Sequence, residues 1–106
     1  MSTTVLRGPR NRTVFSHSTV RFSCTLDTQK EIYWEYDAGD GSYFKIFDSR
    51  GRNEKKFDSR FERTVNGTTS TLVIYNVNKS DEGTYICLES DTSGNRWFAQ
   101  LTVTGK

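Results

Sequence analysis

Apolar and polar side chains alternate along most of the chain, which is the pattern of a β-strand with one buried face. The clearest example spans residues 20–26, where the apolar positions are Val20, Phe22, Cys24 and Leu26. The same two-residue period recurs at 32–37, 43–47, 61–65, 71–75, 83–88 and 97–104. The three-and-four spacing of an amphipathic helix is nowhere sustained, so the sequence predicts an all-β fold.

Turn-forming residues separate these segments. The run Ala-Gly-Asp-Gly-Ser at 38–42 predicts a hairpin, and an Asn-Gly pair predicts a second turn at 66–67. The highly charged stretch 48–59 is expected to be an exposed loop with at most a short edge strand, and 91–95 a flexible loop. A Gly-Pro pair interrupts residues 5–15, which fits an edge strand that breaks and resumes on the other side. Eight or nine short strands with frequent turns indicate a sandwich or a barrel.

The length of 106 residues suits one domain that covers the whole chain. Residues 1–4 are expected to lie outside its fold, because Met1 begins no recognisable signal peptide and resembles a start placed before a mature domain. No apolar run approaches the roughly 20 residues that span a bilayer. The net charge of +2 is too small and too dispersed to indicate a phosphate-binding surface, so nucleic acid is not an expected partner.

Residues suited to catalysis or metal binding are scarce. His17 is the one histidine, and its serine neighbours point to the opposite face of a strand, so they cannot form a relay with it. Asp37, Asp40 and Asp48 lack the ligand spacing and closing Glu of a calcium loop. No zinc spacing or phosphate-binding glycine loop occurs. We therefore expect no enzyme activity, no metal and no cofactor.

Two cysteines and three glycosylation sequons indicate an extracellular protein. If Cys24 and Cys87 are joined, the bond requires an oxidising compartment. The sequons begin at Asn11, Asn66 and Asn78, and are candidate glycosylation sites. The abundance of Ser and Thr in this chain is an alternative explanation for them.

The cysteines also belong to a longer pattern. Trp34 follows Cys24 by ten residues, and an Asp-x-Gly-x-Tyr-x-Cys run ends at Cys87. Together these resemble the immunoglobulin superfamily, and within it the variable-type (V-set) domain. The resemblance covers nearly the whole chain. It implies a two-sheet antiparallel sandwich with Greek-key connections, pinned by a Cys24–Cys87 disulfide with Trp34 packed against it.

The resemblance also assigns structural roles to other residues. Tyr85 takes the position of the tyrosine corner, and Arg60 and Asp81 that of the family's salt bridge at the bottom of the sandwich. Leu72 is expected in the core. The 25 residues between Trp34 and Arg60 leave room for the two extra edge strands of a V-set domain, although intermediate-set adhesion domains share most of the motif.

The last strand departs from the pattern of antigen receptors. Residues 96–103 lack the Gly-x-Gly bulge that shapes pairing between two variable domains. This absence favours a germline-encoded receptor or adhesion domain over a rearranging antigen receptor.

Strand parity predicts a binding surface on the sheet that holds Trp34 and Cys87, here called the front sheet. The side chains expected to point outward from it are those of Tyr33, Glu35, Asp37, Ile86, Leu88, Phe98 and Gln100. A contiguous exposed apolar surface with a charged rim is typical of a protein interface. The alternative is that Ile86 and Leu88 are covered by loops, or by Trp97 and Phe98 folding over them.

The loops at one end form a second candidate surface, made of residues 27–30, 48–56 and 89–96. Arg96 and Trp97 flank a small polar loop of the composition seen in binding loops. Residues 48–56 include four basic side chains. These are either simply solvated at the surface, or they bind an acidic partner or a sulfated glycan.

The sequence thus predicts an extracellular recognition module of an immune-type or adhesion receptor. Its partner is expected to be a protein ligand or counter-receptor, and the parent chain is expected to be either secreted or anchored to a membrane. One alternative is homophilic adhesion, with two front sheets paired about a two-fold axis. The other is a glycan-binding domain that uses Tyr33, Trp97 and Phe98.

Overall fold

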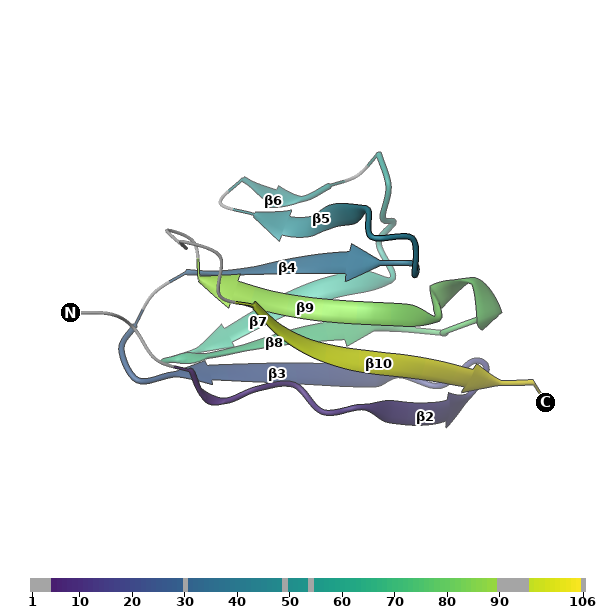
Figure 1. The fold of residues 1–106 in the computed structure, drawn as a ribbon, viewed down its shortest axis with the longest axis horizontal. Coiled ribbons are helices and arrows are strands. Elements are labelled where there is room, and N and C mark those ends of the chain that lie inside the picture. The colour runs from purple at the N-terminus through teal and green to yellow at the C-terminus, as the bar shows by residue number, and fades with distance from the viewer. Residues whose placement is uncertain (1–4, 30, 49, 54, 90–95, 106) are drawn as a thin grey trace.

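The computed structural model describes residues 5–29, 31–48, 50–53, 55–89 and 96–105, and these form two sheets packed face to face (Figure 1). This confirms the prediction of an all-β, two-sheet sandwich. The strands are β1 Val5–Arg7, β2 Arg12–Phe15, β3 Val20–Leu26, β4 Ile32–Asp37, β5 Tyr43–Asp48, β6 Gly51–Arg52, β7 Phe61–Asn66, β8 Thr69–Ile74, β9 Gly83–Glu89 and β10 Arg96–Thr104. One 3-10 helix, η1, spans Lys79–Asp81.

The back sheet has the strand order β1-β3-β8-β7, and the front sheet has the order β2-β10-β9-β4-β5-β6. All pairings are antiparallel except that of β2 with β10, which is parallel. β1 belongs to the back sheet and β2 to the front sheet, which confirms the predicted break at Gly8-Pro9. The short β6 likewise confirms the expectation of at most a brief edge strand in 48–59.

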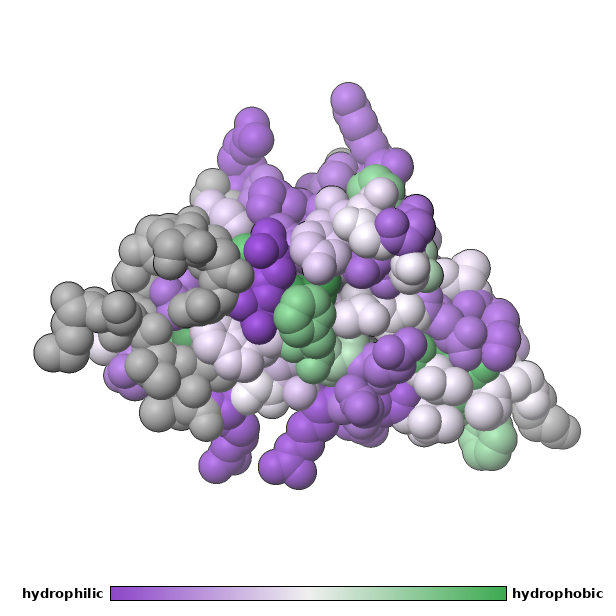
Figure 2. All heavy atoms as spheres, viewed as in Figure 1, coloured by the Kyte–Doolittle hydropathy of each residue, from purple (hydrophilic) through white to green (hydrophobic). Residues whose placement is uncertain are grey.

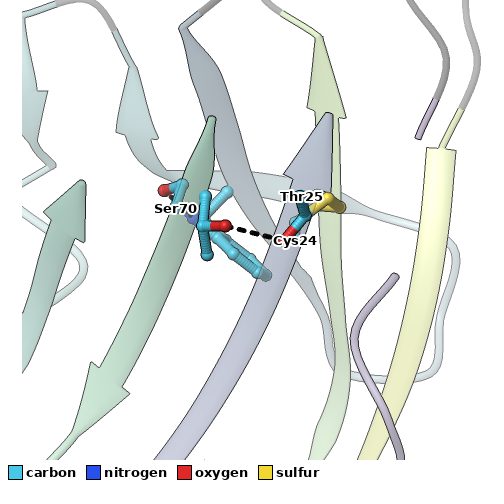
Figure 3. The surroundings of a disulfide bond; sticks show 6 residues. Cys24, Thr25 and Ser70 are labelled. Atoms are coloured by element: carbon cyan, nitrogen blue, oxygen red, sulfur yellow. Dashed lines mark hydrogen bonds between the residues drawn. A yellow bond between two sulfur atoms is a disulfide. The ribbon is translucent and has the colours of Figure 1, made fainter. Parts of the chain in front are cut away.

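The core forms because the alternating strands turn one face toward each other. The apolar residues of β3 are buried, whereas Arg21 and Ser23 between them are exposed. The disulfide joins Cys24 to Cys87 across the two sheets. Cys24 lies opposite Ser70 of the neighbouring strand β8 (Figure 3). The Ser70 hydroxyl accepts a hydrogen bond of 3.0 Å from Nε1 of the fully buried Trp34, so the indole buries no unsatisfied donor.

The Asp-x-Gly-x-Tyr-x-Cys run stabilises the end of the sandwich at which η1 leads into β9. The buried Tyr85 donates its hydroxyl proton to the Asp81 carbonyl oxygen at 2.6 Å, and burial raises the pKa of that hydroxyl. Gly83 has φ +146°, and a β-carbon there would lie 2.7 Å from Cε1 of Tyr36. Position 83 is therefore restricted to glycine by both its backbone conformation and the adjacent ring.

Candidate functional site

The candidate site is the outer surface of the front sheet. The term front face is used here for the outward-pointing side chains of β4, β5, β9 and β10. Strand register places them in rows across the sheet. The central row is Phe98, Ile86, Glu35 and Lys45, and the next row toward the loops is Arg96, Leu88 and Tyr33.

Ile86 and Leu88 lie on this outer side of β9, as their parity predicts, but they are 0% and 3% exposed. The prediction that they form an exposed apolar patch is therefore wrong. Both are absent from the cluster between the sheets, so their burial arises on the outer side of the front sheet. Their cross-strand neighbours Phe98 and Arg96 on β10, and Glu35 and Tyr33 on β4, are placed to shield them there.

Glu35 is also buried, at 3% exposure, instead of forming part of a charged rim as predicted. Its carboxylate accepts a hydrogen bond from Lys45 Nζ at 2.9 Å and another from Arg96 Nε at 3.2 Å. Lys45 comes from β5 and Arg96 from β10, so the two cations reach Glu35 from opposite sides. This ion-pair network compensates the buried carboxylate and forms a polar layer across the sheet.

Aromatic rings complete the front face. Phe98 is 51% exposed and Tyr43 is 45% exposed. The Arg96 guanidinium lies 5.1 Å from the centre of the Tyr43 ring, and Lys45 Nζ lies 5.0 Å from that of Tyr33. Figure 2 shows this side of the molecule, with a hydrophobic patch in its middle beside strongly hydrophilic side chains. The face thus combines exposed rings with cations that are already held in place.

The two remaining predicted partner-binding residues on β10 differ in orientation: Trp97 points inward, whereas Gln100 points outward like Phe98. Trp97 pairs with Cys87 in register and packs against the core, so it does not belong to the front face. Its indole also lies beside Gly8, where the chain passes between the sheets. Gln100 is exposed on β10, and its backbone N–H donates to the Asn11 side chain at 2.8 Å.

The loop end is only partly described, because residues 30, 49, 54 and 90–95 lie outside the described residues. A shallow cavity of about 660 Å³ is lined there by Lys45, Ile46, Asp48, Arg50, Gly51, Arg52, Asn53 and Lys55. Arg50 and Lys55 are exposed, so water can solvate their charges. Lys56 Nζ lies 4.3 Å from the centre of the Phe44 ring.

The Arg60–Asp81 pair lies apart from the front face. Arg60 Nη1 donates to Asp81 Oδ2 at 2.9 Å, and Nη2 donates to Oδ1 at 3.1 Å. This bidentate contact raises the pKa of the Arg60 guanidinium, which therefore stays charged. Nη1 also reaches the carbonyl oxygens of Tyr75 and Asn76, so the pair ties the start of β7 to the chain after β8.

The three sequon asparagines occupy different surroundings. Asn66 is exposed at the β7–β8 hairpin. Asn78 caps η1, with its side-chain oxygen accepting from the backbone N–H of Ser80 at 3.0 Å. Asn11 is tied to Gln100 as described above. All three asparagines are exposed.

The described residues hold no group of three His, Cys, Asp or Glu side chains that could bind a metal ion. Among these residues no helix is long and apolar enough to cross a membrane. The one histidine, His17, makes a side-chain contact across the fold: its Nδ1 lies 2.9 Å from Oδ1 of Asn76.

Comparison with protein families adds independent support for this architecture. The model of the immunoglobulin V-set domain matches residues 7–104, from β1 to the last residue of β10. The match covers both sheets, the disulfide and the Asp-x-Gly-x-Tyr-x-Cys run. The chain therefore belongs to the immunoglobulin V-set family.

Proposed function

We propose that this domain is an extracellular recognition module of an immune-type or adhesion receptor, and that it binds a protein partner through the front face. V-set domains are in general non-enzymatic binding modules of receptors and adhesion molecules, and they commonly bind proteins. A disulfide-linked domain of this kind is typical of extracellular proteins.

One observation carries the choice of surface. The front face presents Phe98, Tyr43 and Tyr33 next to Arg96, and aromatic residues and arginine are the types enriched in the energetic centres of protein interfaces. Because Arg96 is already held by Glu35 and by the Tyr43 ring, its ordering on binding costs less conformational entropy. Preorganised cations and exposed rings together suit a protein surface that offers carboxylates around an apolar centre.

The experiment compares matched substitutions of two exposed phenylalanines. Phe98 lies on the front face, whereas Phe15 lies on β2 and is 63% exposed. A tetramer of the domain is used to screen cells that display extracellular proteins, and each binder is then measured against Phe98→Asp, Tyr43→Ala and Phe15→Asp. We expect the two front-face variants to weaken binding by roughly 30-fold or more, and Phe15→Asp to leave it unchanged.

Melting temperatures close to that of the parent show that the variants are folded. Full binding by both front-face variants, or equal loss with Phe15→Asp, contradicts the proposal.

Sedimentation of the free domain tests the homophilic alternative. A monomer at high micromolar concentration removes self-association as the main role, whereas a dimer broken by Phe98→Asp establishes it. The glycan-binding alternative is weakened by the position of Trp97, which packs against the core.

A further inference from the structure

Four arginines line one shallow depression away from the front face. The depression has a volume of about 190 Å³ and is lined by Arg7, Gly8, Arg10, Arg12, Arg21 and Ser23. Its arginines come from β1, from β2 with the segment before it, and from β3. They are called the arginine cluster below. The net charge of the whole chain conceals this concentration of charge.

The fold brings the four side chains together at the point where the chain changes sheets. Arg7 pairs with Thr25 on the edge of the back sheet, and Arg21 points outward from the same strand as Thr25. Gly8-Pro9 then leads the chain toward the front sheet, which places Arg10 and Arg12 beside them. Figure 2 shows hydrophilic side chains projecting along the lower margin, where Figure 1 shows the segment between β1 and β2.

In the described part of the chain no carboxylate forms an ion pair with the cluster. Among the described residues none of the four guanidinium groups has an ion pair or a side-chain hydrogen bond. The acid that shares a row with Arg21 is Glu62, which is two strands away and accepts a hydrogen bond from Tyr75. Without these four charges the formal net charge of +2 becomes −2 for the rest of the chain. The cluster therefore gathers in one depression a local positive charge that the rest of the chain does not carry as a net charge, and such local charge attracts a polyanion.

The lining indicates the chemistry of the ligand. Guanidinium groups bind the oxygens of sulfate, phosphate and carboxylate groups in pairs, and they remain charged at any physiological pH. Apart from Gly8 and Ser23 the depression is lined by arginine alone. Its described lining includes no aromatic ring on which a nucleobase could stack and no large apolar residue to enter a lipid layer. The ligand is thus expected to be a flexible chain with several anionic groups.

We propose that the arginine cluster binds a sulfated polysaccharide. A disulfide-linked domain of this kind is typical of extracellular proteins, and sulfated polysaccharides occur on cell surfaces and between cells. A polymer with repeated sulfates presents several anionic groups to the four arginines, whereas a small anion presents one. This site is separate from the front face, so polysaccharide and protein partner can bind together.

The test measures elution by NaCl from immobilised heparin and from a sulfopropyl resin. All proteins carry Thr13→Ala, which removes the sequon at Asn11 so that no glycan lies beside the cluster. The cluster variant is Arg10→Gln/Arg12→Gln/Arg21→Gln, three exposed positions at which loss of charge leaves the core untouched. Titration with a heparin oligosaccharide at 0.15 M NaCl gives the affinities.

The control variant removes the same charge from the loop end, as Arg50→Gln/Lys55→Gln/Lys56→Gln. These residues are exposed too, and both variants have a formal net charge of −1. We expect the parent to elute from heparin at higher salt than from the sulfopropyl resin. The cluster variant should bind the oligosaccharide about tenfold more weakly or worse, with a salt slope lower by about one unit for each lost contact, while the control stays close to the parent.

Several results overturn the proposal. If both variants lose the same affinity for the oligosaccharide, binding depends on net charge alone. If the control variant loses more affinity than the cluster variant, the binding site lies at the loop end. A parent that elutes from heparin no later than from the sulfopropyl resin has no specific site. Tighter binding to phosphatidylserine vesicles or to poly-glutamate than to heparin assigns the cluster to a membrane or to an acidic protein segment instead.

Discussion

Replacing Glu35 by Gln tests whether the ion-pair network stabilises the front face. The glutamine keeps the shape that covers Ile86 but removes the charge that Lys45 and Arg96 share. The side chain of Glu35 is 4% exposed, whereas those of Lys45 and Arg96 are 47% and 29% exposed. Both cations can therefore regain water when the carboxylate is lost, and the loss is smaller than for a fully buried pair.

The magnitude follows from that exposure. Exposed ion pairs contribute about 0 to 1 kcal/mol, and breaking a fully buried pair costs about 3 to 5 kcal/mol. For one buried carboxylate with two partly exposed cations we expect the free energy of unfolding to fall by about 1 to 3 kcal/mol. In a domain of this size each kcal/mol lowers the melting temperature by about 4 °C or more.

Urea denaturation followed by tryptophan fluorescence measures the change, with an unchanged slope showing that the unfolded state is the same. Glu62→Gln is the matched control, because Glu62 accepts one hydrogen bond, from Tyr75, on the exposed side of the back sheet. We expect it to change stability by no more than about 0.5 kcal/mol. Equal effects of the two substitutions would refute the stabilising role of the network.

Further predictions concern the disulfide and the tyrosine corner. Cys24→Ala/Cys87→Ala should lower the free energy of unfolding by about 2 to 5 kcal/mol in oxidising buffer, and an unchanged melting temperature contradicts this. Burial raises the pKa of Tyr85 above its ordinary value near 10, so the unfolded chain loses this proton first as the pH rises. The resulting stability is complete below pH 10 and declines above it, by up to about 1.4 kcal/mol per pH unit. Tyr85→Phe should make the decline shallower between pH 10 and 12, and an identical pH profile argues against the assignment.

The fold was largely predictable because its signals are local. Period-two alternation located the strands, and Gly8-Pro9 located the change of sheet. The same parity correctly placed Ile86 on the outer side of the front sheet. It could not predict burial there, because burial depends on how far long side chains such as Arg96 reach across neighbouring strands.

The remaining misses have a similar origin. Trp97 adjoins a polar loop in the sequence, but its register opposite Cys87 turns it toward the core. The arginine cluster was missed because Arg7, Arg10 and Arg21 are spread over three segments, and only the pairing of β1 with β3 and the crossover bring them together.

If a protein partner binds the front face, its protons lie close to amide protons of β4, β5 and β10. Cross-saturation NMR on the isotopically labelled domain in complex with its partner tests this most directly. We predict that saturation transfer is strongest at the amides of Tyr33, Tyr43, Arg96 and Phe98. Strongest transfer at residues 27–29 and 50–53, or on the strands of the back sheet, would contradict binding at the front face.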